Sequence, residues 1–565
     1  MVYAECRSAT ANLRLVAASG GPSRPLTDGP WRDTSPRWSP DGKMVAWLSD
    51  RGGKPAIRLC SREGAAERAL ETGSLEPLAF AWSPEGDSVA FTAAVEVRQD
   101  PPRWAPSDLL PRLRHLRETV VHLFVQPLDP DKRPQEISSA YLDLRGEPAW
   151  MPDGRTILSA AADGRLYAFA AAGGAPRVLA SAGTRNECPL PSPDGARIAW
   201  LQTAGAGQSY ATRKLAVMSP DGSRVRILSG SLDRDAAAPQ WSSDSRTVYF
   251  LADDRGSTHV NAARNDGTLR QATKAVERLS GFSLADNGRA VSVRSAPLAA
   301  GDVYTFTVDH ASEPATLAAP AAGLLAAREA GAVEEISWRS AGHSVQGWLV
   351  RPPGFDPSKK YPLLLDIRDN PRKMYGPDFN LRAQILAGSG FVVLCANPRG
   401  TAGYGEEFGN LLQTRYPGDD FDDLMAGVDL AVSRPYIDSA RLSVVGGLLA
   451  AWAIGHTARF RSAVVVRPVA DWLAEIALAP GGVERALTLM GAMPWDNPDQ
   501  YVKHSPIYFA ANFRTPTLIV ASEGDPQAEE LWFALGVRKV DCAFVHLKPS
   551  ETAAELEAIL AWLKR

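Results

Sequence analysis

The residues best placed for chemistry lie where a short β-branched run at 442–445 meets a run of strong helix formers at 448–454. Gly446 and Gly447 stand between the two runs. A strand, a glycine turn and a helix form the frame of a nucleophile elbow, which presents a serine oxygen for attack on an acyl carbon. Here Leu448 follows the glycines, and no serine stands in the turn. The sequence keeps the frame for acyl transfer and lacks its nucleophile.

Acyl transfer by a serine also needs an imidazole that takes the serine proton, an acid that orients the imidazole, and N–H donors for the oxyanion. The serine normally stands in the pattern G-x-S-x-G, which occurs nowhere in this chain. Ser209 and Ser283 stand in G-x-S-x-A strings within repeated strand segments. We interpret both as strand or loop serines.

The sequence around the elbow resembles that of the prolyl oligopeptidase family of serine peptidases, in its acylaminoacyl-peptidase-like and dipeptidyl-peptidase-like branch. Members of that branch typically read GGSYGGYLTNWIVGHTDRF at this place. Removing SYGG leaves a frame that residues 446–460, GGLLAAWAIGHTARF, match position by position. The resemblance implies a deletion of four residues that removed the serine. Because about 3.6 residues make one helical turn, the apolar face of the helix keeps nearly the same direction.

The acid of the family corresponds to Asp525, since TPTLIVASEGD resembles TPTLLIHGEED of typical relatives. The tyrosine and substrate-contacting arginine that follow in relatives are replaced by Pro526 and Gln527, which run into a helical segment. Without a histidine to orient, Asp525 is interpreted as a loop acid or a helix N-terminal residue.

The family histidine is expected in a loop that reads like PGEGHG after the last strand. Here the strand CAFVHLK runs into Pro549 and then into a helix, whose start is predicted as a capping box of Thr552 and Glu555. His546 is the nearest imidazole, but it lies within the strand. His456 matches a structural position of the family, and His504 precedes a turn.

The oxyanion segment differs as well. Relatives read HGGP after the first buried strand, whereas this chain reads Arg368, Asp369, Asn370 and proline. Replacing two glycines restricts the turn and places side chains where a carbonyl should approach. Tyr404 of NPRGTAGYG is retained and is interpreted as fold-supporting as readily as functional. Compared with the family pattern, this sequence lacks the nucleophile, the base, the oxyanion loop and the substrate-contacting arginine. These four losses together favour a protein that keeps the fold of the family without its catalysis.

The region 1–330 repeats a W-S-P-D-G-like turn followed by a short strand. Six copies begin at Trp38, Trp82, Trp150, Pro191, Trp241 and Leu284, mostly 40 to 50 residues apart. That spacing predicts a β-propeller, and the resemblance implies seven blades. The chain begins inside an early blade, so a first strand is missing or is supplied from elsewhere. Incomplete closure exposes strand edges, and we therefore expect oligomerisation.

A longer interval between the second and third copies contains leucines at helical spacing and the arginines Arg112, Arg114 and Arg117. The pattern predicts an amphipathic helical insertion. One interpretation is that these arginines hold a peptide carboxylate or carbonyl. The interpretation that we prefer is a solvated helix face on the propeller rim.

The region 331–565 alternates apolar strands with helices, as a doubly wound parallel sheet does. An antiparallel pair at 334–355 leads in, followed by the buried strands YPLLLDI and FVVLCAN. The order resembles the catalytic α/β-hydrolase domain of the family.

The composition argues against several kinds of partner and binding site. The chain has 61 Lys and Arg against 64 Asp and Glu, a formal net charge of −3, which gives no reason to expect nucleic acid or an anionic membrane as a partner. Five scattered cysteines indicate neither a disulfide framework nor a zinc site, and no cofactor or metal is expected. The first residues do not resemble a secretory leader, and no apolar run approaches membrane-span length. We therefore expect a cytoplasmic protein.

The leading hypothesis is a pseudoenzyme that binds a peptide-like ligand or pairs with an active relative or with itself. One alternative is an active acylaminoacyl or dipeptidyl peptidase completed by non-standard residues or by a partner chain. Another is a purely structural assembly subunit.

Overall fold

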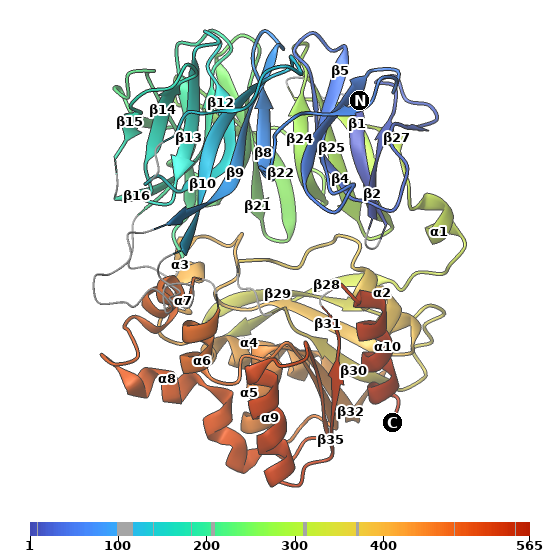
Figure 1. Ribbon diagram of the computed structural model, residues 1–565. Helices are drawn as coiled ribbons and strands as arrows, with labels where there is room; N and C mark the ends of the chain where they lie inside the picture. The colour runs from blue at the N-terminus through green and yellow to red at the C-terminus, as the bar shows by residue number, and fades with distance from the viewer. Residues whose placement is uncertain are drawn as a thin grey trace.

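The chain forms two domains, and Figure 1 shows the computed structural model with the N-terminal domain above the C-terminal one. The structure describes residues 1–7, 10–98, 117–138, 141–181, 183–204, 210–308, 314–368, 372–479, 481–548 and 550–565. Strands of the first domain end at Ala318, and strands of the second begin at Val333. The predicted helical insertion lies outside the described residues, except that Arg117 opens a strand instead.

The first domain is a β-propeller of seven blades, as predicted, and each blade is an antiparallel sheet of consecutive strands. The first blade has three strands, β1 (Val2–Arg7), β2 (Thr10–Leu15) and β3 (Arg24–Pro25), and the others have four. The four-stranded blades are β4 (Asp33–Trp38), β5 (Met44–Ser49), β6 (Ala56–Ser61) and β7 (Arg68–Ala69); β8 (Pro77–Trp82), β9 (Ser88–Arg98), β10 (Arg117–Pro127) and β11 (Gln135–Glu136); β12 (Leu144–Trp150), β13 (Thr156–Ala161), β14 (Leu166–Ala170) and β15 (Arg177–Ala180); β16 (Thr184–Pro191), β17 (Ile198–Ala204), β18 (Arg213–Met218) and β19 (Arg226–Ile227); β20 (Ala236–Trp241), β21 (Thr247–Asp254), β22 (Ser257–Arg264) and β23 (Leu269–Gln271); and β24 (Arg278–Leu284), β25 (Arg289–Ala296), β26 (Ala299–Thr307) and β27 (Ala315–Ala318).

The repeated W-S-P-D-G phrase forms the turn between the first and second strands of a blade. In the second blade, Ser39 Oγ donates to Asp41 Oδ1 at 2.6 Å, and the Ser39 amide donates to the Met44 carbonyl at 2.9 Å. Gly42 takes a φ of +67°, which glycine adopts without strain. The phrase thus starts each second strand in the same register.

The second domain is built on one eight-stranded sheet of order β28-β29-β31-β30-β32-β33-β34-β35, which confirms the predicted α/β-hydrolase fold. β29 pairs antiparallel with both of its neighbours, β28 and β31. The remaining neighbouring pairs, from β31–β30 to β34–β35, are parallel. The strands are β28 (Val333–Ser340), β29 (His343–Val350), β30 (Tyr361–Asp366), β31 (Val392–Asn397), β32 (Ile437–Gly446), β33 (Ser462–Val466), β34 (Thr517–Ala521) and β35 (Cys542–His546).

Helices cover both faces of this sheet. Helices α4, α5 and α9 pack on one face, and α2 and α10 pack on the other, each against an apolar cluster. The helices are α1 (Ala322–Ala326), α2 (Leu381–Gly388), α3 (Glu406–Asn410), α4 (Asp419–Val432), α5 (Leu448–His456), α6 (Trp472–Leu478), α7 (Gly482–Arg485), the π-helix η3 (Ala486–Met490), α8 (Pro498–His504), the 3-10 helix η4 (Pro506–Asn512), α9 (Pro526–Val537) and α10 (Thr552–Leu563). Among the described helices, none has both the length and the apolar character to cross a membrane.

The two domains meet at the carboxyl edge of the sheet, where the loops after β30 and β31 contact the propeller. The β21–β22 hairpin turns at Arg255 and Gly256, and the Arg255 amide donates to the Gly403 carbonyl at 3.0 Å. The Gly256 amide lies 3.2 Å from Met374 Sδ. Arg278 of β24 donates to the Met374 carbonyl at 2.8 Å. The propeller therefore holds the loop that continues from the expected oxyanion segment.

Candidate functional site

The elbow lies at the carboxyl end of β32, between β30 and β33 in the sheet. Gly447 caps α5 with φ −104° and ψ −101°, and the helix begins at Leu448. This is the position at which an α/β-hydrolase presents its nucleophile. Leu448 is 3% exposed and Leu449 is 2% exposed. An apolar, buried side chain at this place has no atom that can attack a carbonyl.

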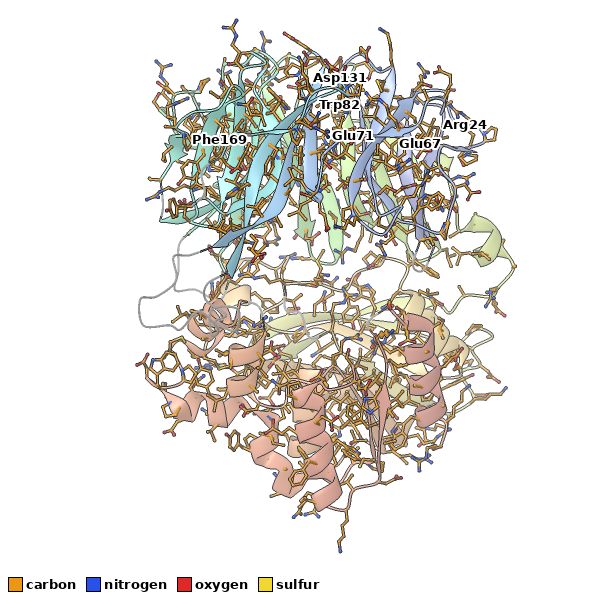
Figure 2. All side chains as sticks on the ribbon, viewed as in Figure 1. Arg24, Glu67, Glu71, Trp82, Asp131 and Phe169 are labelled. Carbon is orange, nitrogen blue, oxygen red and sulfur yellow. The ribbon has the colours of Figure 1, made fainter. Side chains whose placement is uncertain are left out.

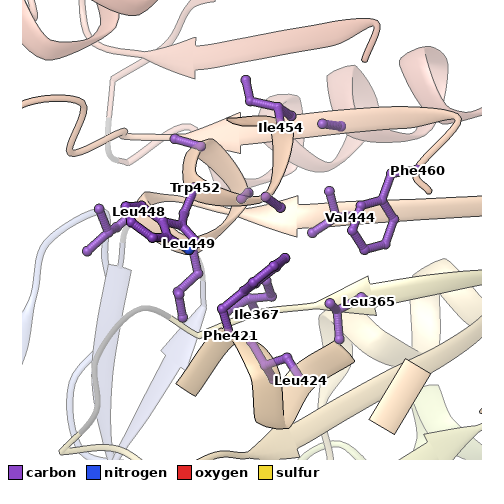
Figure 3. Close-up of a cluster of buried hydrophobic side chains, with 14 of the residues drawn as sticks. Leu365, Ile367, Phe421, Leu424, Val444, Leu448, Leu449, Trp452, Ile454 and Phe460 are labelled. Atoms are coloured by element: carbon purple, nitrogen blue, oxygen red, sulfur yellow. The ribbon is translucent and has the colours of Figure 1, made fainter. Parts of the chain in front are cut away.

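Figure 3 shows the elbow leucines as part of a hydrophobic cluster with Ile367, Phe421 and Trp452. Residues 448–455 of α5 are all buried. Full burial of one leucine contributes about 1.5–3 kcal/mol. The helix that would carry the nucleophile therefore serves as a core helix of the domain.

Asp525, at the acid position implied by the resemblance, is the N-cap of α9. Its Oδ1 accepts hydrogen bonds from the amides of Gln527 at 3.0 Å and Ala528 at 3.2 Å. This confirms the interpretation as a helix N-terminal residue, because a side-chain oxygen that accepts the first free amides is what a helix start requires. The carboxylate is engaged by its own helix.

The described histidines do not supply a base for a nucleophile. Nδ1 of His456 lies 2.9 Å from the Trp452 carbonyl, and Nδ1 of His504 lies 2.8 Å from the Pro417 carbonyl. His546 ends β35, with its ring centroid 4.2 Å from that of Phe544. The Nδ1 atoms of His456 and His504 thus contact backbone carbonyls and not a hydroxyl or thiol.

The expected oxyanion loop starts with Arg368, while Asp369 and Asn370 lie outside the described residues. The Arg368 guanidinium carbon lies 4.2 Å from the ring centroid of Tyr375, a cation–π distance. Its Nη1 donates to the Met374 carbonyl at 2.8 Å. Arg368 thus binds the next loop, which the propeller also holds.

A cavity of about 20 Å³ lies beside the elbow, about the space that one water needs. Its lining includes Arg368, Lys373, Tyr416, Asp420 and Leu449. Asp420 is 1% exposed, and its Oδ1 accepts from the Gly418 amide at 2.8 Å. Burial raises the pKa of the Asp420 carboxyl to about 7. The cavity offers a titratable carboxyl beside about the space of one water.

A buried ion pair beneath this cavity was not foreseen from the sequence. The Arg399 guanidinium donates two hydrogen bonds to the Asp423 carboxylate, from Nε to Oδ2 at 2.9 Å and from Nη2 to Oδ1 at 2.8 Å. The pair fastens the loop after β31 to α4. Both residues stand in conspicuous strings, NPRG and DDFDD. The sequence does not indicate that these two residues pair, because they lie 24 positions apart in the chain.

Tyr404, retained in the NPRGTAGYG string, supports the fold. Its hydroxyl accepts from Asn397 Nδ2 at 2.8 Å and donates to Gln346 Oε1. These partners belong to β31 and β29, so the hydroxyl joins two strands to the loop. Burial raises the pKa of Tyr404, which keeps it a neutral donor.

The described part of the chain holds no group of three or more His, Cys, Asp or Glu side chains arranged for a metal ion. The described residues at the carboxyl edge include an elbow, the capping acid Asp525 and Arg368, which binds the following loop. Together with a seven-bladed propeller above the sheet, these features define a serine-peptidase scaffold.

Residues 377–533 match the model of the prolyl oligopeptidase family. It is 32% identical to the uncharacterized peptidase YuxL of Bacillus subtilis over 309 residues, which are 53% of this chain and 47% of that protein. It is 26% identical to dipeptidyl-peptidase 5 of Porphyromonas gingivalis, over 79% of this chain and 71% of that protein. The match thus spans about half of the first relative and a larger share of the second.

Solved structures share the fold. The acylaminoacyl peptidase of Pyrococcus horikoshii superposes with a TM-score of 0.82 at 18% identity, covering 100% of this chain and 93% of that one. A second acylaminoacyl peptidase, in complex with Z-Gly-Gly-Phe-chloromethyl ketone, gives a TM-score of 0.82 at 18% identity over 98% of this chain and 91% of that one. Both likenesses extend over the propeller and the hydrolase domain.

Proposed function

We propose that this protein is a non-hydrolytic member of the prolyl oligopeptidase family. The observation that carries the proposal is the elbow, which enters α5 through the buried Leu448 and Leu449. The engagement of Asp525 by the amides of its own helix supports the proposal. Removing the nucleophile or the base of a serine peptidase lowers kcat about a million-fold. We therefore expect negligible hydrolysis at this site.

A fluorophosphonate probe tests the proposal, because it labels only an activated serine. We expect no labelling of the protein and no turnover of N-acylaminoacyl or dipeptidyl chromogenic substrates. The variant Leu448→Ser places a hydroxyl at the elbow and is expected to stay unlabelled, since His456 and His504, whose Nδ1 atoms contact backbone carbonyls, are not placed to take its proton. An active peptidase of the family serves as the positive control. Stoichiometric labelling of the natural chain at one serine would instead establish the alternative, an active peptidase completed by non-standard residues or by a partner chain.

A second role, that of an assembly subunit, is favoured by the outer edge of the hydrolase sheet. There β35 is the last strand, and its residues are half-buried or exposed where those of β34 are fully buried. Trp532, Phe533 and Val537 of the adjoining α9 are 46%, 70% and 63% exposed. We infer that a second copy of this chain covers this edge, because β35 carries neither charge nor proline to block pairing and an edge strand can pair with its own copy about a twofold axis.

Light scattering after size-exclusion chromatography tests the subunit role. We expect a particle of twice the chain mass of 60.7 kDa and a shift to monomer for Phe533→Asp. The matched control is Leu324→Asp, which changes a leucine of α1 that is 69% exposed. A monomeric natural chain contradicts self-assembly. Co-purification of that monomer with a peptidase relative would favour the heteromeric partner expected from the sequence.

A peptide-like ligand is the remaining partner expected from the sequence. The elbow cavity of about 20 Å³ speaks against a peptide at the former catalytic position, since that space suits about one water. Peptide binding is therefore proposed only for surfaces away from the elbow.

A further inference from the structure

The W-S-P-D-G-like turn of the third blade differs from the others at its acidic residue. In the second, fifth and sixth blades the aspartate of the phrase accepts a hydrogen bond at 2.6 Å from the serine of the same phrase; these pairs are Ser39–Asp41, Ser192–Asp194 and Ser242–Asp244. The third blade has Glu85 at this position, and its serine, Ser83, donates to Asp87 Oδ1 at 3.0 Å instead. Within the described ranges, the exposed Glu85 carboxylate has no hydrogen bond or ion pair. It is therefore available to a ligand.

This carboxylate borders a cavity of about 250 Å³ between the third and fourth blades. The Glu85 side chain reaches the next blade, since its Oε1 would lie 3.9 Å from a Cβ added at Gly154 of the β12–β13 turn. Figure 2 labels Trp82 and Asp131, the chain neighbours of two lining residues, on the side of the propeller away from the hydrolase domain. The lining includes Glu85, Asp87, Val125, Pro127, Lys132 and Trp150, and we call this space the blade cavity.

The size of the blade cavity suits a small organic molecule. Its volume of about 250 Å³ compares with about 20 Å³ for the cavity beside the elbow. Since one water occupies about 30 Å³ of liquid, the blade cavity has about the volume of eight waters. A ligand of about ten non-hydrogen atoms fills such a space, whereas a folded partner does not enter it.

The blade cavity also carries a charge of the opposite sign. Lys132 lies on the loop between β10 and β11, and its carbonyl accepts a hydrogen bond from Nε2 of the buried Gln126 at 2.9 Å, which fixes the loop. In the part of the chain that the structure describes, no ion pair joins the Lys132 ammonium to Glu85 or Asp87. A molecule that carries both an ammonium and a carboxylate can form charge-assisted hydrogen bonds with both ends of this cavity.

The lining between these charges is apolar. Val125 and Pro127 of β10 are half-buried, and Trp150 of β12 is 9% exposed. The indole N–H of Trp150 donates to the Ala81 carbonyl at 3.3 Å, so its ring offers only carbon atoms to the cavity. An apolar side chain of the ligand fits against these groups, whereas a hydroxyl placed here would lose its hydrogen bonds to water.

We propose that the blade cavity binds a free α-amino acid with an apolar side chain. Glu85 accepts hydrogen bonds from the α-ammonium, and Lys132 donates to the α-carboxylate. The side chain of the amino acid packs against the apolar lining. This site lies in the propeller and goes beyond the function proposed above, because binding here does not depend on whether the protein hydrolyses peptides.

The probe is L-leucine, whose binding to the full chain is measured by isothermal titration calorimetry. We expect saturable, one-to-one binding in the millimolar range or tighter, as for a small ligand held by a few polar contacts. N-acetyl-L-leucine lacks the ammonium and L-leucinamide lacks the carboxylate, so each is expected to bind at least about tenfold more weakly. Absence of saturable L-leucine binding, or equal binding of the three compounds, would overturn the proposal.

Two variants assign the binding to the blade cavity. Glu85→Gln and Lys132→Gln each remove one of the two charges and are expected to weaken L-leucine binding at least about tenfold, with an unchanged melting temperature. The matched controls are Glu63→Gln and Arg133→Gln, which neutralise exposed charges outside the lining and are expected to leave binding unchanged. If Glu85→Gln binds L-leucine as tightly as the natural chain does, the amino acid binds elsewhere and the proposal fails.

Discussion

At the carboxyl edge of the sheet, the charge state of single buried residues affects the stability of the fold. Asp420 is the clearest case, since its carboxyl is buried beside a cavity for one water and has a pKa raised to about 7. In the unfolded chain the same group titrates near pH 3.9. Between these two values the folded state holds a proton that the unfolded state has lost.

Stability from Asp420 is therefore present at acidic pH and is lost as the pH rises through about 7. Asp420→Asn removes this titration, and the amide oxygen can still accept from the Gly418 amide. We expect the variant to gain at most about 4 kcal/mol over the natural chain at pH 8, at about 1.4 kcal/mol per pH unit. Thermal melts of both proteins at pH 5 and pH 8 measure this gain in stability. The assignment would be contradicted if the natural chain were more stable at pH 8 than at pH 5 and if Asp420→Asn abolished that difference.

The Arg399–Asp423 pair makes an independent prediction. Asp423 is completely buried, so Asp423→Asn leaves a buried guanidinium without its bidentate partner. Breaking a buried pair from one side costs about 3–5 kcal/mol, and we expect a correspondingly lower melting temperature. Asp429→Asn is the matched control on the same helix, because Asp429 is 66% exposed in its pair with Arg459 and such a pair contributes about 0–1 kcal/mol. Equal effects of the two variants would show that burial of the pair is unimportant.

Among elements, the β21–β22 hairpin packs directly against the hydrolase domain. Its Gly256 carbonyl would lie 2.1 Å from a Cβ added at Gly376. Gly376→Ala therefore forces the hairpin or the loop to shift, at a cost of about 1–3 kcal/mol. We expect a lower melting temperature and faster proteolysis between the domains.

The control for that variant is Gly388→Ala at the end of α2, where an added Cβ meets no atom within 4 Å. It is expected to leave both readouts unchanged or slightly improved. If Gly376→Ala behaves like this control, the domains are not held by the hairpin.

The sequence identifies most of these elements, since turn phrases and alternating apolar runs are local signals. It places α5 directly after the two glycines, and α5 begins there. It is wrong at α10, where the helix begins with Thr552 after an N-cap at Glu551 and lacks a side-chain cap bond. A capping box at Thr552 fails because the cap geometry depends on how the preceding loop approaches the helix. Long-range partners such as Asp366 and Arg382, 2.9 Å apart, leave no local signal at all.

For the whole molecule, the sequence predicts a β-propeller and the α/β sheet, because the repeats and the alternation of strands and helices follow from short windows. Only six repeat copies are visible, and the number of seven blades came from the resemblance. It also shows that the elbow lacks a serine. It does not show that Leu448 and Leu449 would be buried, or that the cavity beside them would measure about 20 Å³. Those properties depend on long-range packing, such as that of Phe421 and Leu424 of α4 in the same apolar cluster.

The contact between the first and last blades has a mechanical consequence. Neighbouring blades elsewhere are joined by the continuous chain, whereas these two meet through side chains such as Val16, Val303 and Leu317, with no shared strand in the described residues. The ring can therefore part at this seam without the unfolding of any blade. Amide protons of β1 and β27 should accordingly exchange with deuterated solvent sooner than those of β13, and a chain that is pulled or heated should open there first.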